Sequence, residues 1–169
     1  GGKVLTDNNI EILADEFEYN KESSRLVAKK NVLIIDDLNK VTIKASKIIY
    51  LKNEEKFLTE GKTKINIEDK YVINSSNIIF LRNEKKITSD KYTSLIDDEN
   101  NFYTTEKFRY MITTRLFRGN QINLVTNEKD KYFFNDALIN LETKELQGKD
   151  LEVNFKKNMF DNDENEPRL

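Results

Sequence analysis

The sequence repeats itself about every thirty residues, and this repetition restricts the folds open to it. The segment ASKIIYLK, at residues 45–52, returns as SSNIIFLR at residues 75–82. Looser copies begin at residues 14, 105 and 135, so successive copies start 31, 30, 30 and 30 residues apart. A period in this range is typical of a chain that stacks one supersecondary unit on the next.

Each copy contains two stretches in which apolar and polar residues alternate, as in residues 17–19 and 65–67. Alternation in segments rich in Ile, Val, Thr, Tyr and Phe predicts strands with one buried face. The polar connectors of two to five residues favour antiparallel hairpins. We therefore expect an all-β fold of about five two-strand repeats, or about ten strands.

A second column of the repeat interrupts the apolar stretches. It reads Lys30, Gly61, Asp90, Gly119 and Gly148, and Asn or Lys follows at each position. A glycine-rich position inside a strand predicts a bulge or a bend.

Alternation turns one face of every strand inward, and stacking converts that face into continuous rows. The residues expected to line the interior are Phe17, Tyr19, Ile48, Tyr50, Ile78, Phe80, Phe108, Tyr110 and Leu138, faced by Leu26, Phe57, Ile87, Leu116 and Leu146. These rows could pack on each other as an ordinary core. They could instead line a groove between two sheets, in which each buried ligand methylene would contribute about 0.8 kcal/mol. Periodicity does not distinguish the two interpretations.

Composition narrows the function classes. Charged residues make up 34% and hydrophobic ones 37%, which predicts a thin core or an elongated shape. The 28 basic and 30 acidic residues leave a net charge of −2, which argues against nucleic acid as a partner. The chain has no Cys and no His, so disulfides, thiolate or imidazole catalysis and Cys/His metal sites are excluded.

No catalytic site, cofactor or metal site is predicted. The acidic connectors at 36–37 and 97–100 could offer oxygen ligands to a cation, but solvated turns are the simpler interpretation. A β-helical polysaccharide-acting enzyme or adhesin is a rival, although its coils are usually shorter than thirty residues. A β-scaffold without a ligand is a third possibility. No apolar run reaches the length of about 20 residues needed for a membrane span, and no signal peptide is present in this chain.

Two surface features also suggest contacts. A basic column, Arg25, Lys56, Lys86 and Arg115, is either a solvated edge or a row near the groove mouth that meets phosphates or acidic sugars. The first strand, around Ile10 and Ile12, is expected to be an unpaired edge to which another β-protein can add a strand.

The first copy, ADEFEYNKESSRLVAKKNVLII, resembles the repeat signature of the OstA/LptA superfamily of lipopolysaccharide-transport proteins. The matching residues are Ala14, Asp15, Phe17, Tyr19, Leu26, Ala28, Asn31 and Val32. Lys30 replaces the usual glycine, which returns at Gly61 and Gly119, and the resemblance extends from residue 10 to about residue 156.

This resemblance implies a non-enzymatic function in the periplasm. Residues 1–158 would form an antiparallel β-jellyroll (β-taco) whose apolar groove opens along one seam. The acyl chains of lipopolysaccharide would lie inside and its sugars and phosphates outside. An LptA-like protein would dock on the amino-terminal end by edge-strand addition.

Residues 159–169 form a polar tail. Its DNDENEPRL end resembles the segment that leads from the amino-terminal periplasmic domain of LptD proteins toward their outer-membrane barrel. An LptD-type chain would have the LptD barrel and LptE as partners and would be attached to the outer membrane. The absence of cysteine departs from LptD members that join this domain to the barrel by disulfides. An LptA- or LptC-type bridge protein is the alternative.

Overall fold

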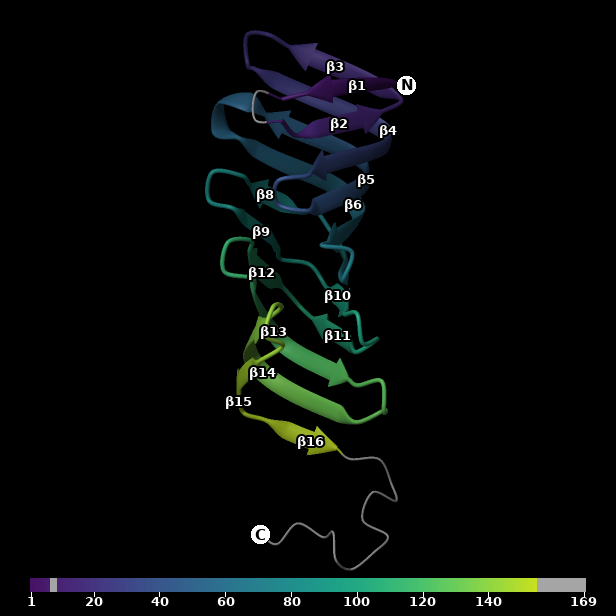
Figure 1. Cartoon of the computed structure of the whole chain (residues 1–169). Coiled ribbons are helices and arrows are strands. Elements are labelled where there is room, and N and C mark those ends of the chain that lie inside the picture. The colour runs from purple at the N-terminus through teal and green to yellow at the C-terminus, as the bar shows by residue number, and fades with distance from the viewer. Residues whose placement is uncertain (7–8, 155–169) are drawn as a thin grey trace, which may run out of the picture.

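Antiparallel strands stacked in a long column make up almost the whole structure (Figure 1). The computed structural model describes residues 1–6 and 9–154. The first eight strands are β1 (Gly2–Leu5), β2 (Glu11–Ala14), β3 (Glu16–Asn20), β4 (Arg25–Asp36), β5 (Val41–Leu51), β6 (Lys56–Ile67), β7 (Tyr71–Ser76) and β8 (Ile79–Leu81). The next eight are β9 (Lys86–Ser89), β10 (Thr93–Ile96), β11 (Phe102–Thr105), β12 (Phe108–Met111), β13 (Leu116–Val125), β14 (Lys131–Asn140), β15 (Leu146–Lys149) and β16 (Glu152–Asn154). A short 3-10 helix, η1 (Lys52–Glu54), follows β5, and no helix in the described ranges is long and apolar enough to cross a membrane.

All sixteen described strands belong to one hydrogen-bonded sheet, and their pairings are antiparallel. The predicted all-β, antiparallel jellyroll of stacked repeats is confirmed by this pairing. A β-helix is excluded as the fold of the described residues, because its successive coils pair in parallel.

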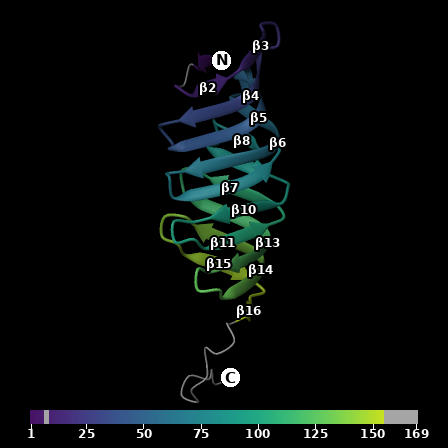
Figure 2. The same cartoon turned by 90° about the vertical axis from the view of Figure 1, so that its right-hand side faces the viewer.

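The sheet is bent along its length into two arms. The first arm contains β1, β2, β7, β10, β11 and β16, and the second arm contains β3, β8, β9, β12 and β15. The long strands β4, β5, β6, β13 and β14 run through both arms. Figure 1 shows β8, β9 and β12 of the second arm beside β10 and β11 of the first, and Figure 2 shows the first arm face-on. The bend joins the arms along one side, and the turns of the two arms face each other along the other side, which we call the seam.

The bend lies at the predicted glycine-rich column, and its backbone shows why. Pairing of β4 with β5 shifts register between Lys29 and Val32, where Lys30 and Asn31 have φ of 63° and 52°. Gly61 has φ of 75° at the same point of β6. Left-handed residues add a local kink and leave one residue unpaired, as in a bulge. The predicted bulge is confirmed at these positions.

Sixteen strands replace the expected ten because several strands break at the bend. Residues 77–78 separate β7 from β8, residues 90–92 separate β9 from β10, and residues 106–107 separate β11 from β12. Buried hydroxyls make hydrogen bonds to the backbone there. The Thr59 hydroxyl accepts from the Ile78 N–H at 2.8 Å, and the Thr105 hydroxyl donates to the carbonyl oxygen of Asn120 at 2.6 Å.

The core lies between the arms and uses different side chains on each. Aliphatic residues dominate the first arm, in the paired row Ile12, Ile34, Ile43, Ile65, Ile73 and Leu95. Aromatic residues dominate the second arm, in the paired row Tyr50, Phe57, Phe80, Ile87, Tyr110 and Phe117. The rings of Tyr50 and Phe57 stack with centroids 4.4 Å apart, and those of Phe57 and Phe80 with centroids 5.7 Å apart.

Two expected interior residues were assigned to the wrong face. Leu116 pairs with Met111 and Leu138 with Arg118, so both lie on the outer face of the second arm. Phe117 and Ile139 take the inward positions instead. Phe117 lies thirty residues after Ile87, so the expected column placed its residue one position too early at Leu116. Ile139 lies only 29 residues after Tyr110, so the repeat is shorter in the last copy. A slip of one residue in a strand reverses the face of its side chain.

The expectation of an edge strand around Ile10 and Ile12 is also wrong. Both side chains are fully buried, and β2 pairs with β1 on one side and β4 on the other. The edges at this end are β1 in the first arm, which pairs with β2, and β3 in the second arm, which pairs with β4.

Candidate functional site

An apolar pocket lies between the arms at the amino-terminal end of the column. Its volume is about 370 Å³, and it is lined by Val4, Leu5, Thr6, Phe17, Tyr19, Leu26, Tyr50 and Lys52. Strand β1 forms its wall on the first arm, and β3, β4 and β5 form its wall on the second arm. Four of the lining residues, Phe17, Tyr19, Leu26 and Tyr50, belong to the columns that the sequence repeat singles out.

The pocket exists because no further described strand covers the inward-facing side chains at this end of the column. β3 is the last strand of the second arm here, and β1 is the last of the first. Tyr19 is therefore 59% exposed, although it stands in register with Leu26 on the inward face. Leu5 on the facing wall is 58% exposed. Large apolar side chains left open to solvent in a cavity are a binding-site signal, whereas single exposed ones are not.

Beyond the pocket, the other expected lining residues pack against each other. Ile48, Phe57, Ile78, Phe80, Ile87, Phe108 and Tyr110 are buried in one continuous core, against which Leu146 packs. Their inward orientation agrees with the alternation of the sequence. Their contact with an elongated ligand stays a prediction.

Three of the four residues of the predicted basic column form a row on the outer face of the second arm. Arg25, Lys56 and Lys86 occupy equivalent positions on the outer face, where each begins the strand after a second-arm turn. Arg115 precedes this position by one residue and adopts φ of 57° in the turn itself. Leu116, thirty residues after Lys86, takes the equivalent position at the start of β13, so the expected column was one residue too early at Arg115.

From its turn position, Arg115 crosses the seam. Its guanidinium pairs with the Glu68 carboxylate, which belongs to the turn after β6 in the first arm. The guanidinium also lies near the hydroxyl of Tyr110, a fully buried residue. Burial raises the pKa of Tyr110, and the nearby Arg115 guanidinium offsets part of that increase.

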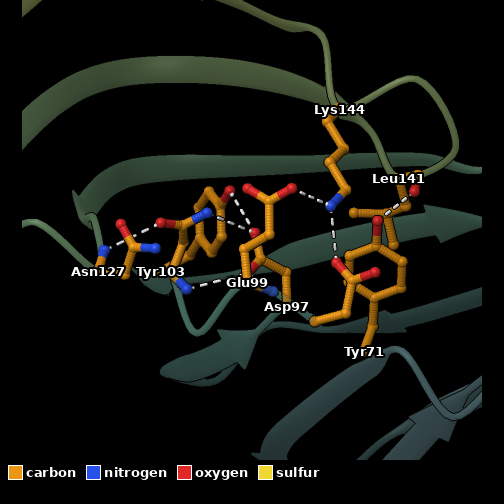
Figure 3. Close-up of polar contacts among 9 residues, drawn as sticks. Tyr71, Asp97, Glu99, Tyr103, Asn127, Leu141 and Lys144 are labelled. Atoms are coloured by element: carbon orange, nitrogen blue, oxygen red, sulfur yellow. Dashed lines mark hydrogen bonds and ion pairs between the residues drawn. The ribbon is translucent and has the colours of Figure 1, made fainter.

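A second group of contacts crosses the seam in the C-terminal half (Figure 3). The ammonium of Lys144, in the turn after β14, lies 2.8 Å from Asp98 Oδ1 and 2.5 Å from Glu99 Oε1 in the facing turn. The Tyr71 hydroxyl donates to the carbonyl oxygen of Leu141. Hydrogen bonding to Lys144 lowers the pKa of Asp98, and the two carboxylates raise the pKa of Lys144. We call the contacts of Lys144, Tyr71 and Arg115 across the seam the clasp.

The acidic connector that contains Asp97 builds the facing turn. Asp97 Oδ1 accepts from the backbone N–H groups of Glu99 and Asn101 at 3.0 and 2.9 Å, and Oδ2 accepts from the Asn101 amide and the Tyr103 hydroxyl at 2.9 and 3.1 Å. The Asn101 amide oxygen accepts in turn from the backbone N–H of Asn127 (Figure 3). Burial, followed by the charge of Asp97, raises the pKa of Tyr103.

The connector at 36–37 works in the same way, because Asp36 accepts two hydrogen bonds from Asn39 at 3.1 and 2.8 Å. Both connectors are therefore turn-forming elements. Within the described ranges, no group of three or more acidic side chains could hold a metal ion.

Sequence reasoning missed the clasp and the buried hydroxyls of the bend. The partners of the clasp are far apart in the chain, with Lys144 and Asp98 separated by 46 residues. No local pattern relates such residues. Two of the hydroxyls could have been found, because Thr59 and Ser89 closely precede the glycine-rich column at Gly61 and Asp90, whereas Thr105 is far from that column in the sequence.

No family model matches the chain, and no curated protein matches it. The chain is similar to a solved structure of LptH from Pseudomonas aeruginosa, described as the LptA homologous periplasmic component of the conserved lipopolysaccharide transport device. The superposition has a TM-score of 0.36 and a sequence identity of 9%, and it covers 89% of this chain and 97% of LptH.

Proposed function

We propose that this chain is a non-enzymatic module of lipopolysaccharide transport that holds acyl chains between its arms. The observation that carries the proposal is the apolar pocket at the amino-terminal end. Its walls include Phe17, Tyr19, Leu26 and Tyr50. Phe17, Tyr19 and Leu26 are also residues through which the first repeat resembles the OstA/LptA signature.

The size of the pocket defines what it can hold. Its volume of about 370 Å³ is at the lower end of the range for small-molecule pockets, about 300–1,000 Å³. It therefore holds part of an acylated molecule, with about 0.8 kcal/mol gained for each buried methylene. Deeper entry requires the arms to separate along the seam, since the inner rows pack against each other in this structure.

A photo-crosslinking experiment tests the proposal. Benzoylphenylalanine is introduced in place of Tyr19 or Tyr50, which line the pocket, and the variants are irradiated with lipopolysaccharide. Phe102 is the matched control, because it is an exposed aromatic residue next to the inward-facing Tyr103 and so on the outer face. We expect labelling from Tyr19 and Tyr50 and little from Phe102. Equal labelling from all three positions would contradict the proposal.

A ligand-free structural scaffold is the second candidate. The dense packing of the inner rows beyond the pocket favours it, with Phe57, Phe80 and Tyr110 each at most 1% exposed. This candidate predicts no labelling from Tyr19 or Tyr50 at any lipopolysaccharide concentration.

We further propose that an LptA-like protein adds a strand to the amino-terminal edge, formed by β1 and β3. Among the strands that the structure describes, β1 pairs only with β2, so its outer side offers backbone groups to a partner. Within this proposal the chain is periplasmic. In its LptD form it is attached to the outer membrane through the LptD barrel and LptE, and in its LptA or LptC form it is a bridge protein. The proposed boundary between residues 158 and 159 lies outside the described residues.

Proline substitution tests the edge. Successive N–H groups of an edge strand point alternately to its neighbour and to solvent. Of Lys3→Pro and Val4→Pro, one should therefore keep the pairing with β2 and remove a donor from the open edge. We expect that variant to fold, as judged by circular dichroism, and to lose affinity for an immobilised LptA-like protein. Unchanged affinity in both folded variants would exclude β1 as the docking edge.

A further inference from the structure

A groove of about 870 Å³ lies on the outer face of the first arm, on the opposite side of the sheet from the core. Strands β4, β5, β6, β7 and β10 contribute to it, and Figure 2 shows them side by side. Its lining residues are Asn31, Val32, Leu33, Lys44, Ala45, Lys62, Thr63, Lys64, Asn74, Ser75, Ser76, Tyr92 and Ser94. None of them is acidic.

Three lysines give the groove a concentrated positive charge. Lys44 on β5 stands directly opposite Lys64 on β6, and Lys62 is two residues from Lys64 on the same face. Like charges directly opposite each other in a sheet are destabilising. No acidic side chain in the described part of the chain pairs with any of the three.

The second arm contains the same arrangement with its charge neutralised. Lys29 on β4 stands directly opposite Lys47 on β5. Lys29 pairs with Glu18 at 2.5 Å, and Lys47 pairs with Glu60 at 2.8 Å. The chain thus supplies acidic partners to one opposed lysine pair and leaves the other pair without them. A pair of like charges that the protein itself does not neutralise is a candidate functional position, because such violations of local preference are expected at functional sites.

We propose that this groove binds a phosphorylated saccharide. The opposed ammonium groups of Lys44 and Lys64 suit a compact doubly charged anion, for which lysine is a common point-charge partner. The groove volume falls in the range of small-molecule sites, about 300–1,000 Å³. The amides of Asn31 and Asn74 and the hydroxyls of Ser76 and Ser94 offer donors and acceptors to ring hydroxyls.

An aromatic side chain completes the site. Tyr92 is 68% exposed at the groove, where its ring face can pack on the apolar face of a sugar ring. The site does not rest on the proposed function, because it lies on the outer face and needs no separation of the arms.

The test is a titration of the ¹⁵N-labelled chain with glucose 1-phosphate, inorganic phosphate and glucose, followed by NMR. We expect saturable shifts at the backbone amides of Lys44, Lys62 and Lys64, strongest for glucose 1-phosphate. The affinity should fall as salt rises, because exposed charges are screened. Absence of saturable shifts with glucose 1-phosphate would overturn the proposal, and equal affinity for inorganic phosphate would overturn its saccharide part.

A matched pair of double variants locates the site. Lys44→Gln with Lys64→Gln should weaken binding of glucose 1-phosphate about tenfold or more, as expected for loss of charged hydrogen bonds. Lys29→Gln with Lys47→Gln makes the same change of net charge on the other opposed pair and should leave the affinity unchanged. Equal weakening in both double variants would show a general charge effect and overturn the site.

Vesicles distinguish the two sources of such a ligand. Binding to phosphatidylcholine vesicles that carry a phosphorylated glycolipid would assign a lipid-linked saccharide, and binding to glucose 1-phosphate without vesicle binding would assign a soluble one. Both results support the groove. Equal binding to vesicles with phosphatidylglycerol would overturn it, because that lipid has no sugar ring.

Discussion

Asp97 shows how one side chain can organise a turn at the seam. The residue is buried, and both of its carboxylate oxygens accept hydrogen bonds from the turn and from Tyr103. The turn then places Asp98 and Glu99 opposite Lys144. A local hydrogen-bonding role at Asp97 thus determines a long-range contact of its neighbours.

Asp97→Ala should lower the free energy of unfolding by about 1–3 kcal/mol, because buried donors lose their acceptor. Urea unfolding followed by circular dichroism measures this change. Asp90→Ala is the control, since the Asp90 side chain is 77% exposed and makes an ion pair with the adjacent Lys91. A similar loss in both variants would contradict the assigned role of Asp97.

Lys64 illustrates the opposite case, a residue whose position costs stability. Lys64→Gln should raise the free energy of unfolding by roughly 0.2–1 kcal/mol, because it removes the repulsion from Lys44 across the strand pair. Lys47→Gln should bring no such gain, since Lys47 is paired with Glu60. Urea unfolding at low salt compares the two variants. A loss of stability in Lys64→Gln would show that Lys64 has a stabilising partner.

At the scale of elements, the turns of the two arms decide whether the seam is closed. The clasp joins the turn after β14 to the turn after β10, and the turn after β12 to the turn after β6. The ion pairs of the clasp are partly exposed, whereas the bend on the other side is built from continuous backbone. The seam is therefore the side along which the arms can separate.

The clasp should depend on pH in a direction set by its charges. The pKa of Asp98 is lowered, so the stabilisation from its carboxylate is present above the ordinary aspartate value of about 3.9 and is lost as pH falls through the lower folded value. The pKa of Lys144 is raised, so its contribution is complete below the ordinary lysine value of about 10.4 and is lost as pH rises through the folded value. The Lys144–Asp98 contact of the clasp should therefore be formed between about pH 4 and pH 10.

Spin labels test this pH dependence, and the cysteine-free chain makes labelling simple. Labels at Glu128→Cys in the first arm and Glu142→Cys in the second report the width of the seam by electron double resonance. We expect longer distances at acidic pH than at neutral pH, and longer distances at neutral pH when Lys144→Gln is added. If the distance distribution is unchanged at acidic pH and in the Lys144→Gln variant, Lys144 has no role in closing the seam.

At the scale of the molecule, the column is not uniform along its length. In the first part, β4, β5 and β6 run unbroken through both arms over 12, 11 and 12 residues. In the middle, β7 to β12 are strands of three to six residues that stop at the bend. The hydrogen-bonded ladder is therefore interrupted at the bend in the middle of the column.

Hydrogen exchange should reflect this difference. We expect the slowest exchange in β4, β5 and β6 and faster exchange at residues 90–92 and 106–107, because local opening needs least energy where the ladder is interrupted. Exchange followed by mass spectrometry at peptide resolution measures it. Equal protection along the whole column would indicate one cooperative unit instead.

Strand type and inward face could be read from the sequence for most of the column. Alternation identified Ile48, Tyr50, Phe80 and Phe108 as inward residues, because side chains of a strand alternate between its faces whatever surrounds them. The glycine-rich column likewise indicated the bend, since Gly61 adopts the positive φ that the bulge requires. These are short-range constraints, and a single sequence contains them.

The register of the strands and the contacts that close the seam were decided only by the tertiary structure. The outward face of Leu138 reflects a repeat that is one residue shorter in the last copy, and the register of β13 shows that the columns assigned to Leu116 and Arg115 were one residue too early. The contact of Lys144 with Asp98 joins residues that no local pattern relates. The opposed lysines Lys44 and Lys64 meet only through strand pairing. Local preference thus determined what each segment is, and the pairing of distant segments determined which faces close on each other and where charge is left uncompensated.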